Sequence, residues 1–242
     1  MAHINLNVVT CLCEEYHSQD RQLGIAITAK KGCTEVTKDI LVFTPINPLR
    51  PFSEKLGCLH RHNVLGQNDT TLFDYVEQEC LLPSNMQKEG LYRGQNVVRN
   101  FNEVYVRNKD KYKFICKWDD DIVMPAGTIQ RCLQIFRDEK CIGVGLFQEN
   151  YGAPNILKIN PVKEGWTGAF SRFYIYRMEA WGVVPVILGS SSGDPDNKYQ
   201  RSINGTKHIL DCVNIHLDHR ACGNNPALYK VLLDLAEYMV IK

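Results

Sequence analysis

The chain has 242 residues, of which 44% are hydrophobic and 23% charged, a composition typical of ordinary globular proteins. Its 28 Lys and Arg residues against 27 Asp and Glu residues give a formal net charge of +1, which excludes a global electrostatic attraction to nucleic acid or anionic membranes. No apolar run approaches the roughly 18–20 residues that a transmembrane helix needs, so we expect no membrane span.

Cysteine usage and the N-terminus indicate the compartment. The 10 cysteines are scattered, several of them in strand-like runs, and no Cys-x-x-Cys pair occurs. The first residues lack the charged region and the long apolar region of a signal peptide. These features favour free thiols over disulfides or a structural zinc site, and we expect a cytoplasmic protein in a reducing compartment.

Strand and helix patterns alternate in the first part of the chain. They predict a strand over 6–12, a helix over 14–30 and a second strand over 40–44. The prolines of residues 44–51 predict a loop, and residues 52–90 give no clear pattern. A helix over 96–106, a strand over 113–118, a helix over 128–136 and a strand over 142–147 follow.

After about residue 150 the alternation lapses into aromatic and glycine-rich segments at 165–168, 170–177 and 189–193. A helix is then predicted to start at Asp196, a strand to cover 212–217, and an amphipathic helix to cover 226–239. The alternation predicts βαβ units around a mainly parallel sheet flanked by helices. Because no repeat or linker interrupts the chain, we expect a single α/β domain.

The most informative stretch is the acidic triplet at the end of the predicted strand over 113–118. Asp119, Asp120 and Asp121 repel one another unless something positive lies among them. Hard divalent cations prefer oxygen ligands and often share them with a substrate's phosphates. Asp119 and Asp121 have the spacing that places two side chains on one face of an extended segment. The pattern therefore predicts a site for a metal ion and a phosphate.

A plain structural explanation competes with this prediction. The triplet could be a solvated turn in which Asp121 caps a helix that begins near Ala126. The apolar residues on both sides favour a functional site instead, because they place the acids at the end of a core strand. That edge is where ligands bind in open α/β sheets.

Residues 117–125, Lys-Trp-Asp-Asp-Asp-Ile-Val-Met-Pro, resemble the Asp-x-Asp segment of GT-A glycosyltransferases, especially the large inverting family with a Rossmann-like first half. Four more stretches follow the order of that family: residues 92–100 resemble its Gly-x-x-x-Ala-Arg-Asn helix, 165–170 its glycine-rich acceptor loop, 193–201 its Glu-Asp helix start, and 214–217 its histidine-bearing strand. The compact size and the Cys-Leu-Cys start are similar to small phage-encoded transferases. The resemblance implies one GT-A domain, with a nucleotide-sugar-binding half over about 1–125 and an acceptor-binding half over about 126–242.

The resemblance also implies a metal site. Asp121 is expected to be the main ligand of Mn²⁺ or Mg²⁺, with Asp119 assisting or contacting the nucleotide ribose. His216 is expected to complete the protein ligands, with His219 as its competitor. A histidine ligand favours Mn²⁺ slightly. The alternative for His216 is a hydrogen-bonded histidine on a strand.

An inverting transfer needs a general base to take the proton of the acceptor hydroxyl. Asp196 is the first candidate because it lies at the expected helix start, and Asp194 is the second. The proline between them departs from the family's Glu-Asp pair. The alternative for Asp196 is an N-cap.

The resemblance also implies which residues bind the donor and which bind the acceptor. The nucleotide sugar is expected to contact Thr10, Arg99, Asp119 and Asp120. Arg99 would pair with the diphosphate, and its alternative is a surface salt bridge. The acceptor is expected to contact Trp166, Gly168 and Phe170. Core packing explains the two aromatic residues equally well.

The resemblance implies a metal-dependent enzyme that moves a sugar from a nucleotide-sugar donor to a hydroxyl acceptor with inversion. The acceptor stays open between a glycan, a protein and a hydroxymethylated pyrimidine in DNA. A nucleotidyltransferase is one alternative, although the glycine-rich, lysine-bearing loop typical of that class is missing after the first predicted strand. A catalytically inactive GT-A-like domain that binds a sugar or a partner is the other.

Overall fold

The computed structural model describes residues 38–47, 53–67, 72–82, 84–147, 158–159, 168–187, 195–217 and 226–241. The predicted strand over 6–12 and helix over 14–30 lie outside these residues. The elements, in chain order, are β1 (Ile40–Ile46), α3 (Ser53–Leu65), β2 (Phe73–Glu79), α4 (Ser84–Lys88), α5 (Arg93–Asn108), β3 (Phe114–Trp118), β4 (Ile122–Val123), α6 (Thr128–Ile135), β5 (Cys141–Gly145), β6 (Lys158–Ile159), β7 (Phe173–Arg177), α7 (Pro195–Ser202), β8 (Thr206–Ile209), β9 (Val213–His216) and α9 (Pro226–Ile241).

The centre of the molecule is a six-stranded sheet with the strand order β2-β1-β3-β7-β5-β8. β1 runs parallel to β2 and β3, and β5 runs parallel to β8. β7 is antiparallel to its two neighbours, β3 and β5. The predicted mainly parallel α/β sheet is therefore confirmed, with β7 as its one antiparallel strand. Strands from before and after residue 125 join this single sheet.

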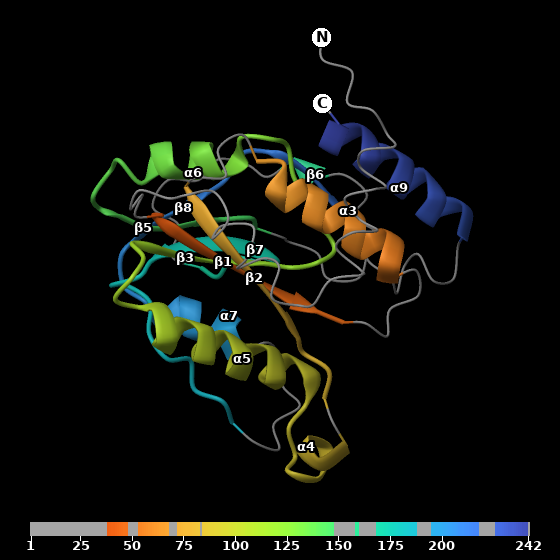
Figure 1. Cartoon of the computed structure of the whole chain (residues 1–242). Coiled ribbons are helices and arrows are strands. Elements are labelled where there is room, and N and C mark those ends of the chain that lie inside the picture. The colour runs from red at the N-terminus through yellow and green to blue at the C-terminus, as the bar shows by residue number, and fades with distance from the viewer. Residues whose placement is uncertain are drawn as a thin grey trace, which may run out of the picture.

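Helices cover both faces of the sheet: α3, α6 and α9 lie on one side, and α5 and α7 on the other (Figure 1). The side chains of β3 alternate between two apolar clusters, with Cys116 and Trp118 in the cluster beside α6 and Ile115 in the cluster beside α5. Because both of its faces are buried, β3 reads as an apolar run. Lys117 is the exception within it, and it faces the same side as Ile115.

The helix predicted over 96–106 is α5, which begins earlier and ends later. Val98, Phe101 and Val104 recur at helical spacing and are buried against the sheet. The ring of Phe101 stacks on that of Phe43 from β1, with centroids 5.2 Å apart. At the helix start, the Gln95 side chain accepts a hydrogen bond of 3.0 Å from the backbone N–H of Tyr92, one of the donors that a helix start leaves unsatisfied.

The loop predicted over 44–51 begins later than expected, because β1 continues through Pro45 to Ile46. Proline lacks an N–H donor and is rarely found inside a central strand. The pairing explains the exception: β1 pairs with β3 only as far as Phe43, whereas its pairing with β2 continues to Ile46. Pro45 therefore lies where β1 has become an edge.

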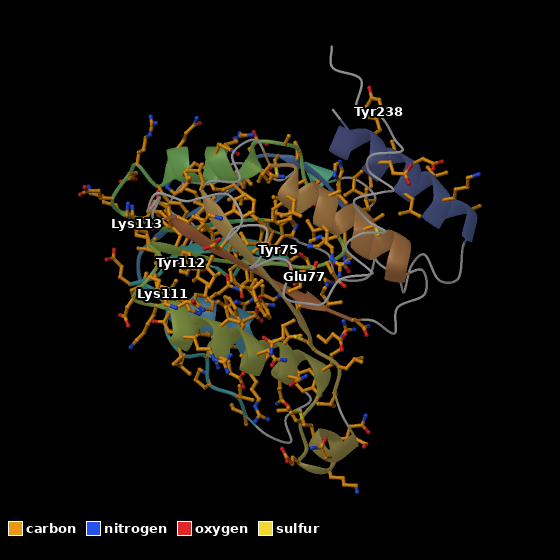
Figure 2. The ribbon with its side chains drawn as sticks, viewed as in Figure 1. Tyr75, Glu77, Lys111, Tyr112, Lys113 and Tyr238 are labelled. Atoms are coloured by element: carbon orange, nitrogen blue, oxygen red, sulfur yellow. The ribbon has the colours of Figure 1, made fainter. Side chains whose placement is uncertain are left out.

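Polar contacts fix α3 and α6 beside the sheet. The guanidinium of Arg61 contacts both carboxylate oxygens of Glu77 at 2.7 and 2.8 Å. The Tyr75 hydroxyl donates to the same carboxylate at 2.6 Å, and Figure 2 labels Tyr75 and Glu77. At the start of α6, the Gln67 side chain accepts the backbone N–H of Thr128 at 3.0 Å.

Gly127, at the N-cap of α6, has a φ of 78°, a backbone conformation that favours glycine. Asp121 is therefore not the cap of this helix.

A second, three-stranded sheet has the order β4-β9-β6, and its strands pair antiparallel. Its strand β9 is the predicted strand over 212–217. The six cysteines within the described residues are free thiols. Among the described helices, none has both the length and the apolar character needed to cross a membrane.

Candidate active site

The chain turns sharply where β3 ends. The backbone N–H of Asp119 donates to the carbonyl of Arg172 at 2.8 Å, and the N–H of Ile122 donates back to the carbonyl of Asp119 at 3.2 Å. The second bond closes a turn over residues 119–122. The spacing of Asp119 and Asp121 predicts that both side chains share one face of an extended segment, and the turn shows that this prediction is wrong. The two carboxylates contact different groups.

Asp121 meets His216, 95 residues later in the chain. Strand β4 pairs with β9 so that Ile122 lies opposite His216, and the N–H of Leu217 donates to the Asp121 carbonyl at 2.8 Å. This pairing brings Asp121 Oδ2 to 3.3 Å from His216 Nε2. Both residues are buried, at 2% and 6% exposure. The structure thus brings two predicted metal ligands together, and the same contact fits a hydrogen-bonded strand histidine.

The donor atoms of this pair fit a divalent cation that takes its remaining ligands from a substrate and from water. Carboxylate oxygen suits Mg²⁺ and Mn²⁺, and of these two ions Mn²⁺ accepts an imidazole nitrogen more readily. Within the part of the chain that the structure describes, no group of three or more His, Cys, Asp or Glu side chains is placed to hold a metal. Magnesium is commonly bound through one or two carboxylates, and phosphate oxygens and water complete its shell. Asp121 supplies one such carboxylate, and His216 could supply a further donor atom.

Asp119 lies between two cations. Its Oδ1 is 2.9 Å from Lys117 Nζ, and its Oδ2 is 3.7 Å from Arg172 Nη1. The Asp119 side chain is 13% exposed and that of Lys117 is 11% exposed, so water screens this attraction only partly. Lys117 and Arg172 therefore offset the charge of Asp119, and with it part of the repulsion expected within the acidic triplet. Asp120, in the turn between the two acids, is 8% exposed.

Asp196 approaches the same cluster from the first turn of α7. Its Oδ2 accepts a hydrogen bond of 2.9 Å from the Tyr174 hydroxyl and lies 3.7 Å from Lys117 Nζ. Its Oδ1 accepts the backbone N–H of Asn197 at 3.0 Å. Burial, reinforced by the charge of Asp196, raises the pKa of Tyr174 well above its ordinary value, so this hydroxyl stays a donor. Since α7 begins at Pro195, Asp196 lies inside the helix and is not its N-cap.

Gln200, one turn after Asp196, ties α7 to the predicted acceptor loop. Its side chain accepts the backbone N–H of Phe170 at 2.9 Å and donates to the Phe170 carbonyl at 3.3 Å. Lys207, which is fully buried, donates to the Gln200 carbonyl and to the Gly168 carbonyl, the latter at 3.4 Å. Burial lowers the pKa of Lys207. These contacts join the loop, α7 and β8 into one unit.

Phe170 is a core residue. It is 1% exposed, and its ring lies 5.8 Å from that of Tyr176. Gly145 on β5 leaves space for it, because a Cβ at Gly145 would lie 2.6 Å from the Phe170 ring. The structure favours the core-packing alternative for Phe170 over stacking on a sugar or base.

Other predicted site residues lie elsewhere or outside the described residues. Arg99 is exposed on α5, and its predicted pairing with the diphosphate stays a prediction. The roles of Thr10, Trp166, Asp194 and His219 remain predictions, since these four lie outside the described residues.

Sequence reasoning missed four residues of this cluster: Lys117, Arg172, Tyr174 and Gln200. Lys117 carried a usable signal, because a lysine within an apolar, doubly buried strand needs a counter-charge nearby. Arg172 and Tyr174 carried none, since their positions depend on the direction in which β7 enters the sheet.

Comparison with known proteins gives only distant likenesses. No protein-family model matches the chain, and no curated protein matches it. Among solved structures, A197 from STIV is 16% identical over 74% of this chain and 85% of its own, with a TM-score of 0.45. S. aureus TarS (a fragment of residues 1–349) is 12% identical over 82% of this chain and 64% of its own, with a TM-score of 0.49.

A third solved structure is a glycosyltransferase involved in the glycosylation of the major capsid of PBCV-1. It is 10% identical over 59% of this chain and 61% of its own, with a TM-score of 0.36. Likenesses at these scores carry no argument about activity.

Proposed function

We propose that this protein is a metal-dependent glycosyltransferase of the GT-A type, which moves a sugar from a nucleotide-sugar donor to a hydroxyl acceptor with inversion. The observation that carries the proposal is the convergence of Asp119, Asp121, Asp196 and His216 at one end of β3. These residues come from three separate stretches, and the spacing between Asp121 and His216 is 95 residues.

Asp121 and His216 would hold the cation in this proposal. A bound Mn²⁺ or Mg²⁺ would neutralise the negative charge that develops on the departing nucleoside diphosphate. The carboxyl ends of the parallel strands β1, β2 and β3 point to this edge, which is the usual ligand-binding edge of an α/β sheet.

Asp196 would act as the general base. The acceptor oxygen forms a bond to the anomeric carbon, the bond from that carbon to the diphosphate oxygen breaks, and the acceptor proton moves to an Asp196 carboxylate oxygen. A carboxylate has about four lone-pair sites, so the contacts of Asp196 with Tyr174 and Asn197 leave capacity for the acceptor hydroxyl. Asp194 remains the second candidate for this role.

A direct test incubates the protein with UDP-, GDP-, ADP- and CDP-sugars and MnCl₂, and follows thermal stabilisation and nucleoside diphosphate release. We expect one nucleotide class to stabilise the protein in a Mn²⁺-dependent way and to be consumed, slowly with water and faster with an acceptor. Absence of both effects with all four donor classes would exclude the proposed function. Proton NMR of the product tests inversion, since an α-linked donor should give a β-linkage.

A further inference from the structure

Strand β7 brings a cation to the edge where the donor is expected. Because β7 runs antiparallel to β3, its first residue lies beside the last residue of β3, with Phe173 opposite Trp118. The residue before β7 is Arg172, and the residue after β3 is Asp119. The N–H of Asp119 donates to the Arg172 carbonyl at 2.8 Å, which fixes the two residues side by side.

The backbone of Arg172 is strained. Its φ is 63°, and it is the one non-glycine residue with a positive φ in the described part of the chain. Side chains other than glycine adopt this conformation at an energetic cost, and such residues concentrate at active sites and ligand clamps. Glycine would adopt this backbone conformation with the least strain. An arginine here therefore costs stability, which suggests that its side chain has a role of its own.

The guanidinium is held near Asp119 by charge. Arg172 Nη1 lies 3.7 Å from Asp119 Oδ2, a distance longer than a hydrogen bond, so the contact orients the guanidinium without fixing its planar fork on the carboxylate. The side chain of Arg172 is 25% exposed, compared with 11% for Lys117. Lys117 also lies within 4 Å of two acids, Asp119 and Asp196. Arg172 is thus the more accessible cation at this edge.

We propose that Arg172 binds the diphosphate of the nucleotide-sugar donor and that Asp119 positions it. This inference rests on the proposed function and deepens it. A guanidinium presents five N–H donors in a planar fork that matches two phosphate oxygens at once. A diphosphate that bridges from Arg172 to a cation on Asp121 and His216 would have positive charge on both of its sides. The family resemblance implies that Arg99 binds the diphosphate, whereas the structure points to Arg172. Substituting Arg172 therefore distinguishes the two assignments.

Calorimetry with UDP, GDP, ADP and CDP, each with MnCl₂, tests this role. We expect Arg172→Gln and Arg172→Gly to raise the Kd of the preferred diphosphate by about tenfold to a hundredfold, because a charge-assisted contact is lost. The matching nucleoside, which has no phosphate, should bind these variants as it binds the parent. Arg131→Gln, at an exposed position on α6, is the matched control and should leave every Kd unchanged.

The glycine variant separates binding from folding. Glycine adopts a φ of 63° readily, so Arg172→Gly should unfold at a Tm no lower than that of the parent while its diphosphate affinity falls. An Arg172→Gly variant with a lower Tm and an unchanged diphosphate Kd would make Arg172 a structural ion-pair residue and overturn the inference, although the proposed function would stand. A parent protein that binds none of the four diphosphates would overturn the proposed function and this inference together.

Discussion

Asp119 and Asp121 are two residues apart, yet they belong to different surroundings. Asp119 faces two cations, Lys117 and Arg172, and connects to Asp196 through Lys117. Asp121 faces the imidazole of His216 across the β4–β9 pairing. The turn over 119–122 separates them. A run of like charges is therefore divided into a carboxylate that contacts the protein's own cations and a carboxylate that contacts the imidazole of a histidine.

The largest effect is expected from a substitution of Asp196, which belongs with Asp119 to the acids that contact Lys117. Asp196→Asn should lower sugar transfer by about a hundredfold to ten-thousandfold, because a general base contributes about that much. The donor Kd should stay nearly unchanged, since the base acts on the acceptor. Steady-state kinetics and calorimetry measure the two quantities separately. If Asp194→Asn gives this separation and Asp196→Asn does not, Asp194 is the base; if neither does, the helix-start segment has another role.

Lys117→Met tests whether the cation on that side is required for folding. Removing one partner of a buried ion pair typically costs about 3–5 kcal/mol, because an uncompensated charge remains. Lys113→Met is the matched control: its side chain is 73% exposed in a contact of 2.9 Å with Asp39, so we expect a loss below about 1 kcal/mol. Urea unfolding measures both. Equal losses would mean that Lys117 is screened as well as Lys113.

The Asp121 side can be tested by pH through His60, which is buried beside Trp118 and contacts Thr44. Burial lowers the pKa of His60 from 6.5 to about 4, and the nearby charge of Asp121 opposes this shift only in part. As the pH falls, the unfolded chain therefore takes up a proton on His60 before the folded protein does. The contribution of neutral His60 to stability is fully present above pH 6.5, decreases below that pH, and is lost as the pH falls through 4. The loss reaches about 3 kcal/mol at most.

His60→Gln, which keeps a polar side chain, should remove this part of the pH dependence. The free energy of unfolding, measured between pH 4 and 7, should fall less steeply for the variant than for the parent. Parallel curves for the two proteins would contradict the prediction.

The smallest expected effect compares the two acids directly. Asp121→Asn should weaken Mn²⁺-dependent binding of a nucleoside diphosphate by about tenfold to a hundredfold, since a charged ligand is lost. Asp119→Asn should keep the dependence on Mn²⁺, because Asp119 contacts cations of the protein. Titrations with and without MnCl₂ measure this difference. If both variants lose the Mn²⁺ dependence equally, Asp119 is also a ligand.

The sequence predicted those elements whose pattern is local. Phe114–Trp118 is an apolar run between charged residues, and α5 has apolar residues at helical spacing, so both were predicted within a few residues of their observed bounds. In contrast, α3 and β2 were missed, because α3 mixes histidine, asparagine and arginine with few apolar residues, and β2 carries several acids. Contacts such as Arg61 with Glu77 stabilise these elements, and no local pattern shows them.

The candidate site was predicted in its acids and its histidine but not in its cations. Asp121 and His216 belong to motifs that can be read one at a time. Arg172 and Tyr174 reach the acids only because β7 enters the sheet between β3 and β5 in the opposite direction. That direction depends on long-range pairing, which sequence periodicity does not encode.

The bonds from Gln200 and Lys207 have a consequence for how acceptors would be distinguished. They make the Gly168–Phe170 loop and the helix that carries Asp196 one stiff piece. A loop pushed aside by an ill-fitting acceptor would take the carboxylate with it. Under the proposed function, poor acceptors would then be recognised by slow turnover at saturation rather than by weak binding, so selectivity would appear in kcat more than in KM.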